Sequence, residues 1–429
     1  MTFGIGTSWI APLLTSLRKS NSEFTLTIED CSWIGSFMFI GRMLGPIIII
    51  PIDDIMGCRE ILVLGFLNLL LSWIILIFTR TIFMLIVSRF IFGLALGIID
   101  IPYPIYISEN CSPNMRGIFT SLLMLFYYFG FTLGYALPGF FSYSTTLNVN
   151  ATFGIIAVIS TLLLKEPAQY LTAKGKYDKA EKNFFWLREC NDATRKEFDE
   201  IKKYVLEKSK FPFKLLFCNK INRKTFSIVF FLSFLTTASG MPAITVAITF
   251  LLSQMGESRS NQLSILFGLV QFFSVFLFSF FAEKFDRRKL FLFSSLISGL
   301  VHFISGTLYC IHQNILQVPY FNIFILITIC IYSIIFGTIF LPLFIIIRGE
   351  LLHQNIKIIG GCLTMVMQSA ISFAQIKLFF IVAEKYGIQV NFFIYSIVSF
   401  ILVVFVYFQL PETRGLSLVE IQKSLENLK

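Results

Sequence analysis

Apolar runs of about 20 residues recur along the whole chain, and they constrain the fold more than any other feature. A helix of that length crosses the roughly 30 Å hydrocarbon core of a bilayer. Lipid offers no partners for backbone polar groups, so a segment that spans it must satisfy them internally, as a helix does. Charged residues make up only 14% of the chain, about half of the usual share. The sequence therefore predicts an all-α polytopic membrane protein in contact with a lipid bilayer.

One polar stretch divides the apolar sequence into two parts of similar length. Between Lys165 and Lys224 there are 16 Lys and Arg against 9 Asp and Glu. Positive charge concentrates in cytoplasmic segments of membrane proteins, so we expect this linker in the cytosol. Most of the net charge of +10 lies there, and it therefore gives no reason to expect nucleic-acid binding.

The runs predict twelve membrane helices, six on each side of the linker. The segments expected before the linker are 1–17, 32–52, 61–78, 83–108, 117–142 and 152–164. Those expected after it are 226–252, 263–282, 290–311, 321–347, 358–382 and 392–408. The first run is short for a complete span, and we interpret it as the outer part of a truncated helix 1.

Four units follow from this pattern. Residues 1–164 form an N-terminal six-helix bundle, 165–225 a cytosolic linker with short amphipathic helices, 226–410 a C-terminal six-helix bundle, and 411–429 a cytosolic tail. Both termini are expected in the cytosol. In the linker, Asp192 is a candidate cap of a helix in which Phe198, Ile201 and Val205 fall on one face. Asp178 is the expected start of another helix that ends near Arg188.

The sequence shows no residue pattern typical of a metal site, a disulfide framework or an enzyme active site. The eight cysteines form no CxxC pair and the three histidines lie far apart, so neither a metal site nor a disulfide framework is expected. The polar segments hold no nucleophile–base set and no phosphate loop. We expect no enzyme and no cofactor.

Motifs at the ends of the two halves resemble the sugar-porter family of the major facilitator superfamily. The linker begins with Lys165-Glu-Pro-Ala-Gln-Tyr-Leu171, and the last helix leads into Pro411-Glu-Thr-Arg-Gly-Leu-Ser-Leu418. Arg89-Phe-Ile-Phe-Gly93 fits the same family, and Cys31-Ser-Trp-Ile-Gly-Ser36 with Gly41-Arg42 is most similar to its insect facilitated trehalose transporters. The resemblance implies two bundles around a central cavity that opens alternately to each side. It also implies a monomer in the plasma membrane.

The charged motif residues fall at the expected cytosolic helix ends. Opposite charges there can pair when the inner side is closed and separate when it opens. Exposed pairs contribute about 0–1 kcal/mol each, so only a network would bias the two states. The candidate gate residues are Arg59, Glu109, Arg116, Glu166, Arg287, Arg288, Glu350, Glu412 and Arg414. Cys58 stands where the family has a basic residue, which predicts a weaker gate in the N-terminal half.

The substrate-binding positions implied by the resemblance are poor in amides. A desolvated sugar hydroxyl needs a hydrogen-bond partner. The implied positions are Met124, Thr236, Thr237, Ser239, Gly240, Pro242 and Ile345. The family has a Gln at the first position, a Trp at the last, and amides around the Ser-Gly pair, so this cavity is expected to offer fewer donors and acceptors.

Three charges lie inside expected spans: Arg42, Arg89 and Asp100. Each costs about 3 kcal/mol or more at the bilayer centre, so each should face protein or water. Asp100 is either a proton or cation site or a buried partner for an arginine. Family members that couple to protons carry an acidic residue in helix 1, and Met1–Leu17 has none, so passive uniport is the default.

The resemblance thus implies a facilitative sugar transporter, for trehalose or a hexose, that works by alternating access on a small-molecule substrate. Two alternatives stay open: a non-transporting sugar sensor or degenerate paralogue, and a proton-coupled carrier of another small solute that uses Asp100. Asn150-Ala-Thr152 is a glycosylation sequon, and the expected topology places it outside the cell.

Overall fold

The computed structural model describes residues 1–17, 26–52, 55–111, 113–187, 194–195, 198–199, 202, 216–254, 260–281, 286–314, 320–353 and 356–412. The elements formed by these residues are all helices. Ten helices within this part of the chain are long and apolar enough to cross a membrane. The predicted all-α membrane fold is confirmed.

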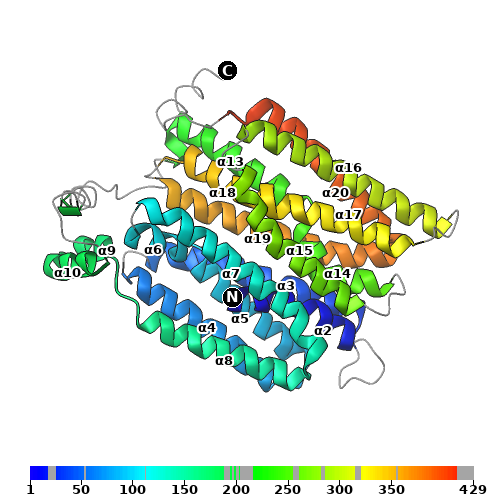
Figure 1. Ribbon diagram of the computed structural model, residues 1–429, viewed down its shortest axis with the longest axis horizontal. Helices are drawn as coiled ribbons and strands as arrows, with labels where there is room; N and C mark the ends of the chain where they lie inside the picture. The colour runs from blue at the N-terminus through cyan, green and yellow to red at the C-terminus, as the bar shows by residue number, and fades with distance from the viewer. Residues whose placement is uncertain are drawn as a thin grey trace.

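The first half of the chain forms the blue to green helices of Figure 1. They are α1 (Thr2–Ser8), α2 (Ile10–Leu17), α3 (Ile28–Ile52), α4 (Cys58–Ile77), α5 (Ile82–Ile99), α6 (Pro102–Asn110), α7 (Pro113–Phe140) and α8 (Tyr143–Leu162). Together α1 and α2 occupy the first expected span. The chain begins in the middle of the molecule (Figure 1), where a Cβ atom on Gly130 of α7 would lie 2.0 Å from the Met1 carbonyl oxygen.

The second half repeats the pattern with two interrupted spans. Its helices are α13 (Lys220–Ala238), α14 (Met241–Gln254), α15 (Ser260–Phe281), α16 (Arg287–Asn314), α17 (Phe321–Ile335), the π-helix η1 (Phe336–Phe340), α18 (Leu341–Leu351), α19 (Lys357–Tyr386) and α20 (Ile388–Gln409). The α13–α14 span breaks at Ser239 and Gly240, and the α17–α18 span contains η1. Such local departures from α-helix are frequent at functional sites.

Two short helices lie at one end of the molecule, beside the bundles (Figure 1). They are α9 (Ala168–Ala173) and α10 (Tyr177–Leu187), which follows the expected start near Asp178. Their contact is apolar and includes Leu171 of α9 with Ala180 and Phe184 of α10. Phe198 of the linker joins the same cluster, with its ring centroid 5.3 Å from that of Phe184. Most of the second expected linker helix, with Asp192, Ile201 and Val205, lies outside the described residues.

The start of α8 corrects one expected boundary. The helix begins at Tyr143 rather than 152, and the Ser142 hydroxyl accepts a hydrogen bond from the Thr145 backbone N–H. The polar residues of 143–151 indicate a loop. In the structure, however, Thr146 and Asn150 face inward and are each 1% exposed. The folded chain therefore buries the Asn150 amide, and glycosylation at the expected sequon stays a prediction.

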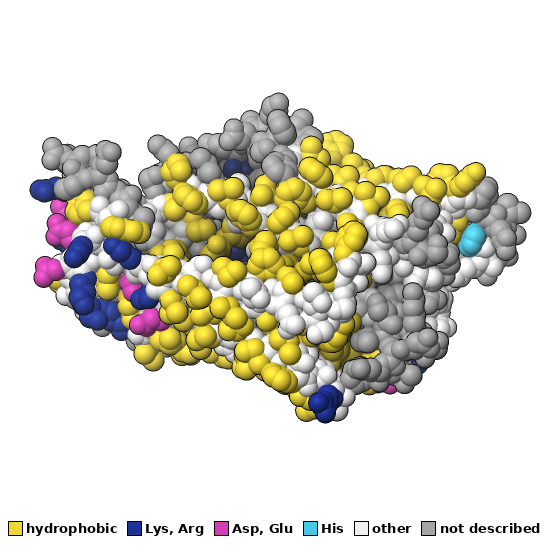
Figure 2. Space-filling view, turned by 60° about the horizontal axis from the view of Figure 1, so that its bottom comes forward, with side chains coloured by type: hydrophobic (Ala, Val, Ile, Leu, Met, Phe, Trp, Pro, Cys, Tyr) yellow, Lys and Arg dark blue, Asp and Glu magenta, His cyan; other side chains and the backbone are white. Residues whose placement is uncertain are grey.

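Charged and hydrophobic side chains occupy different parts of the molecular surface. Figure 2 shows hydrophobic side chains over its middle and Lys, Arg, Asp and Glu gathered at the end that carries α9 and α10. On α8, Ile155, Ile156 and Ile159 are each about half exposed. Such a broad apolar surface is unfavourable in water and suits a helix that contacts lipid.

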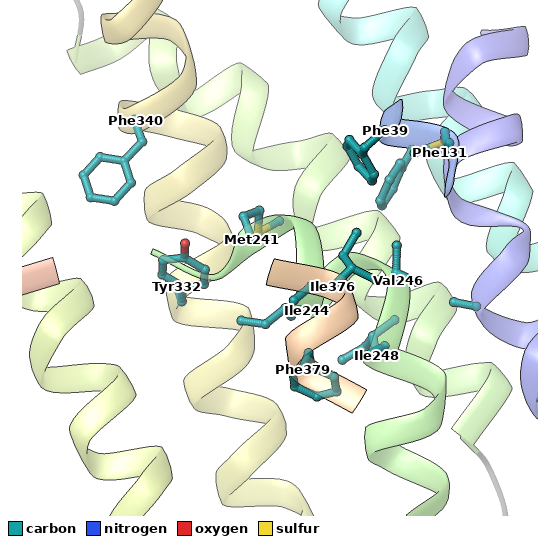
Figure 3. Packing of buried hydrophobic residues seen from close by; sticks show 14 of the residues in the cluster. Phe39, Phe131, Met241, Ile244, Val246, Ile248, Tyr332, Phe340, Ile376 and Phe379 are labelled. Carbon is teal, nitrogen blue, oxygen red and sulfur yellow. The ribbon is translucent and has the colours of Figure 1, made fainter. Parts of the chain in front are cut away.

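The two halves meet along α2–α14, α3–α19 and α7–α15. Of these helices, α2 and α14 lie toward the end of the molecule away from α9 and α10 (Figure 1). Tyr135 of α7 donates a hydrogen bond to the Thr245 carbonyl oxygen of α14 at 2.7 Å. One buried cluster runs through both halves and includes Phe39 and Phe131 of the first, facing Val246 and Ile376 of the second (Figure 3). That end of the interface is closed by packed side chains.

Candidate functional site

An ion pair between Arg42 and Asp100 lies halfway along the membrane helices. Nη2 and Nε of Arg42 lie 2.7 and 2.8 Å from the same carboxylate oxygen of Asp100. The side chains are 30% and 25% exposed. Charged groups at this depth are tolerated where they line water or protein. Both charged side chains are therefore partly accessible in the middle of the molecule.

Close packing of α3 on α5 brings the pair together. A Cβ atom on Gly45 would lie 2.3 Å from the Gly97 carbonyl carbon, and one on Gly97 would lie 2.4 Å from the Arg42 carbonyl oxygen. Glycine is needed wherever two backbones approach this closely. Asp100 follows the last residue of α5, and Pro102, which donates no backbone hydrogen bond, begins α6. Arg89, earlier in α5, is 1% exposed and donates to the Gly6 carbonyl oxygen at 2.7 Å, so it faces protein.

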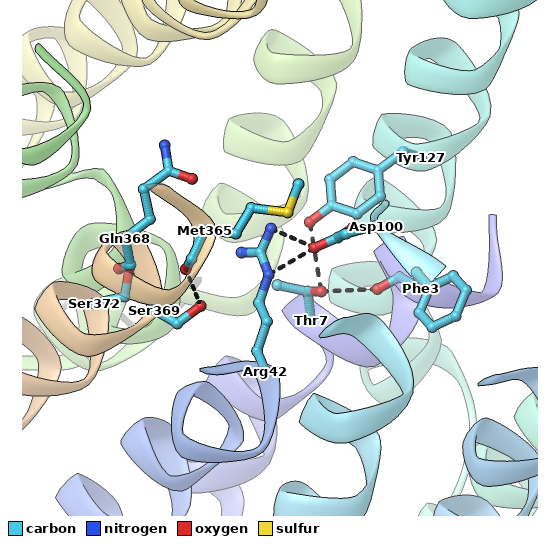
Figure 4. Close-up of polar contacts among 9 residues, drawn as sticks. All are labelled: Phe3, Thr7, Arg42, Asp100, Tyr127, Met365, Gln368, Ser369 and Ser372. Carbon is cyan, nitrogen blue, oxygen red and sulfur yellow. Dashed lines mark hydrogen bonds and ion pairs between the residues drawn. The ribbon is translucent and has the colours of Figure 1, made fainter. Parts of the chain in front are cut away.

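Polar side chains from both halves surround the ion pair (Figure 4). On one side, the hydroxyl of Tyr127 in α7 lies 3.5 Å from that of Thr7 in α1. On the other side, α19 presents Gln368, Ser369 and Ser372 (Figure 4). Hydroxyls and amides are the groups that bind a polyhydroxylated solute. The arrangement can therefore hold a small polar molecule between the halves.

Two more cations lie in the second half, at the adjoining ends of α18 and α19. Arg348 is in the last turn of α18, and its guanidinium lies 5.6 Å from the centroid of the Phe344 ring. Lys357 is the first residue of α19, and its ammonium lies 3.6 Å from where a Cβ on Gly349 would be. A positive side chain in the last turn of a helix, such as that of Arg348, is favoured by the helix dipole.

The break between α13 and α14 is held by specific contacts. Gly240 has a φ of +123°, and a Cβ there would lie 2.8 Å from the Tyr395 ring. The Ser239 hydroxyl lies 2.7 Å from the Tyr332 hydroxyl. Nε2 of Gln375 donates to the Ala238 carbonyl oxygen at 2.9 Å, which satisfies one backbone acceptor that the break releases. These contacts therefore stabilise the break between α13 and α14.

The substrate positions implied by the sequence cluster partly at this break. The hydroxyls of Thr236 and Thr237 donate to carbonyl oxygens of their own helix, at 2.7 and 2.8 Å. Pro242 lies in the first turn of α14. Met124 in α7 and Ile345 in α18 are partly exposed. Their contact with a substrate stays a prediction.

Sequence reasoning missed the amides supplied by other helices. Nε2 of Gln271 in α15 and Oε1 of Gln375 in α19 are buried, and neither atom has a hydrogen-bond partner among the described residues. Buried polar atoms in native proteins are seldom left unpaired, so each has a free position for a ligand or water. The available signal was an uncharged amide inside an apolar run, which the sequence shows for both residues and for Gln368.

The candidate gate residues form the same arrangement at the end of each half. Glu166 accepts a hydrogen bond at 3.3 Å from the Arg59 backbone N–H at the start of α4, and the Arg59 guanidinium donates to the Leu162 carbonyl oxygen. Glu412 accepts from the backbone N–H groups of Arg287 and Arg288, at 3.1 and 3.0 Å, at the start of α16. A carboxylate at a helix N-terminus is favoured by the helix dipole.

One contact distinguishes the two halves. Arg287 forms an ion pair with Glu350, whereas Cys58 of the first half contacts the Pro102 carbonyl oxygen at 3.2 Å. Glu109 lies in α6 and is partly exposed. The Arg116 side chain and Arg414 lie outside the described residues. The contacts described here join residues within one half, and the proposed exchange of pairs between halves remains a prediction.

The chain is similar to known transporters both in sequence and in fold. The family model for "Sugar (and other) transporter" matches residues 12–425. A facilitated trehalose transporter from Apis mellifera ligustica is 25% identical over 99% of this chain and 85% of its own length. One from Culex quinquefasciatus is 23% identical over 99% of this chain and 83% of its own length. The inward open conformation of the xylose transporter from E. coli has the same fold, with a TM-score of 0.81 at 17% identity, covering 99% of this chain and 96% of that one.

Proposed function

The chain belongs to the sugar (and other) transporter family, within the major facilitator superfamily, and on that premise we propose that it carries a sugar across a membrane by alternating access. The substrate class that its relatives suggest is trehalose or a hexose. Those relatives are transporters, and the proposal contains no covalent step.

The observation that carries the proposal is the polar site between the halves. Arg42 and Asp100 are partly exposed at mid-membrane depth. Tyr135 of α7 is hydrogen-bonded to Thr245 of α14 across the interface, and α14 lies toward the end away from α9 and α10 (Figure 1). A site reachable from one side and sealed from the other is what alternating access requires. With the basic linker in the cytosol, the reachable side is the cytosolic one.

Passive uniport is the mode that the contacts favour. Asp100 lies against two nitrogens of Arg42, which fits the second of its two expected roles, a partner for an arginine. A proton-coupled carrier would need a carboxylate that changes its charge during transport. We also propose that the protein is a monomer in the plasma membrane with both termini in the cytosol. The positive charge of the linker supports the orientation of the termini.

The test is uptake of radiolabelled trehalose and glucose into liposomes that contain the purified chain, with empty liposomes as the control. Saturable uptake of either sugar, unaffected by an imposed proton gradient, is the expected result. Binding of a sugar without uptake would instead identify a sensor. A second control is Gly240→Leu, which is expected to abolish uptake because its side chain meets the Tyr395 ring.

A further inference from the structure

One histidine lies inside a membrane span. His302 is in the middle of α16 and is 1% exposed. An ionisable side chain inside a bilayer is costly unless it faces protein and pairs with polar groups there, so its presence indicates a specific role. That role is not contact with a solute in the central site, because α16 lies on the side of the second half that faces away from the first (Figure 1).

His302 contacts both interrupted spans of the second half. Of its two ring nitrogens, Nε2 has no hydrogen-bond partner among the described residues, and Nδ1 donates to the carbonyl oxygen of Ser239 at the α13–α14 break. The His302 ring also lies against that of Tyr332 in α17, with the ring centroids 4.2 Å apart. Tyr332 lies one turn before η1, which interrupts the other span. One side chain thus reaches both departures from regular α-helix.

The break releases carbonyl oxygens of α13, and specific donors satisfy them. The last carbonyl groups of a helix have no partner within it. The Thr236 carbonyl accepts from the Ser239 hydroxyl at 2.7 Å, and the Ala238 carbonyl accepts from Gln375 at 2.9 Å. His302 supplies the donor for the carbonyl of Ser239, a residue that is fully buried. Leaving a buried carbonyl oxygen unpaired is unfavourable, so His302 stabilises the chain at this position.

Tyr332 joins the end of α13 to the start of α14. The Ser239 hydroxyl gives its only proton to Thr236, so the Tyr332 hydroxyl, 2.7 Å away, donates to Ser239. The same Tyr332 oxygen accepts from the backbone N–H of Met241, the first residue of α14. Tyr332 and Met241 are labelled in Figure 3. Because His302 packs on the Tyr332 ring, it acts on both sides of the break.

The position of α14 determines whether one end of the interface is closed. Thr245 of α14 accepts a hydrogen bond from Tyr135 of the first half at 2.7 Å. A Cβ atom on Gly35 of α3 would lie 2.8 Å from Cγ1 of Val246 in α14. These contacts require α14 to continue from α13 in one direction. The break is where that direction is set.

We propose that His302 is a positioning residue for transport, which fixes the α13–α14 break through the Ser239 carbonyl oxygen and the Tyr332 ring and so holds α14 against the first half. The inference rests on the proposed transport function and adds to it a residue that biases the two states without touching the solute.

Two substitutions that imitate different ring nitrogens test the proposal. The amide of His302→Asn reaches the place of Nδ1 and keeps a donor for the Ser239 carbonyl oxygen. The amide of His302→Gln reaches the place of Nε2 and leaves that oxygen without a donor. Hydrogen–deuterium exchange along α14 is measured on the full chain in detergent. Exchange should rise about fivefold in His302→Gln and less than about twofold in His302→Asn, because one net hydrogen bond shifts an equilibrium by that factor.

A matched control lies one turn further along the same helix. Ser305 is 1% exposed and donates to the Thr328 hydroxyl at 2.8 Å. Ser305→Ala removes a buried hydrogen bond of α16 without touching the break, so exchange along α14 should not change. Tyr332→Phe removes the hydroxyl and keeps the ring, and it should also raise exchange. This variant tests the same contacts if His302→Gln does not fold.

Uptake into liposomes is the second measurement. The closed end must form again in each transport cycle, so the maximal rate of sugar uptake should fall about fivefold in His302→Gln and less than about twofold in His302→Asn. A purely structural role for the buried ring would make the two variants equal, because each replaces the ring by a shorter or more flexible amide.

The outcomes separate the inference from the function it rests on. Equal exchange in His302→Asn and His302→Gln, or an equal rise in Ser305→Ala, would overturn the positioning role. If the unmodified chain takes up no sugar, the proposed function fails, and the exchange measurements still decide whether His302 fixes the break.

Discussion

Lys377 of α19 holds its ammonium 3.7 Å from the centroid of the Trp33 ring of α3, and the contact joins the two halves of the molecule. The same ammonium donates to the Ser32 hydroxyl at 2.8 Å, and the Trp33 ring lies 6.3 Å from that of Phe373. These residues lie in the first turns of α3 and the second half of α19. They stabilise the closed end of the interface.

Removing this cation should loosen the closed end. A cation–π contact contributes about 0.5–2 kcal/mol, so Lys377→Met should raise the population open at that end by roughly twofold to thirtyfold. Hydrogen–deuterium exchange at the start of α3 and the end of α19 should increase accordingly. Lys385→Met, which removes an exposed lysine from the last turn of the same helix, should leave exchange unchanged. Equal hydrogen–deuterium exchange in the two variants would show that the contact between Lys377 and Trp33 does not hold this end of the interface closed.

The Gly240 position should tolerate no side chain. Its φ of +123° is strained for other residues, and a Cβ would meet the Tyr395 ring at 2.8 Å. Gly240→Ala should therefore cost about 1–3 kcal/mol of stability and lower the thermal unfolding temperature in detergent. The control is Gly361→Ala in α19, where a Cβ meets nothing within 4 Å. That variant should be neutral or more stable by up to about 1 kcal/mol.

The order and extent of the membrane helices could be predicted from the sequence because they follow from local properties. Apolar runs set the spans, although the break between α5 and α6 at Pro102 falls inside the single span expected over 83–108. The start of α8 could not be predicted in this way. Its first turns carry Thr146 and Asn150, and only the packing of α8 on α4 determines that these polar side chains face inward.

The central site was predictable only in part. The sequence shows that Arg42 and Asp100 each need a partner inside the membrane. Their pairing depends on how closely α3 approaches α5, which Gly45 and Gly97 permit and no local pattern reveals. The same limit applies to Gln375, whose partner is a carbonyl oxygen released by the break in another helix.

Glu166 should make stability depend on pH. Burial raises the pKa of its carboxyl group above the ordinary value. The folded chain therefore binds this proton more tightly than the unfolded chain does. The contribution of Glu166 to the unfolding free energy increases as pH falls through the folded-state pKa, and it levels off below the unfolded value of about 4.3. Glu166→Gln should remove this dependence from thermal unfolding curves measured between pH 7 and pH 4. If the unfolding temperatures of the unmodified chain and of Glu166→Gln depend on pH in the same way, Glu166 is not the source of this dependence.

The Arg42–Asp100 pair offers a test that separates structure from proton coupling. Asp100→Asn leaves the Arg42 charge without its partner, and breaking a partly buried ion pair from one side is expected to cost about 1–3 kcal/mol of stability. Arg42→Gln should have a similar cost. The double variant should recover part of the loss, because it removes both charges together. Thermal unfolding of the four proteins in detergent measures this coupling.

Uptake by the unmodified chain should not respond to an imposed proton gradient. If it does respond, and Asp100→Asn abolishes the response while the fold is retained, Asp100 is a proton site and passive uniport is excluded.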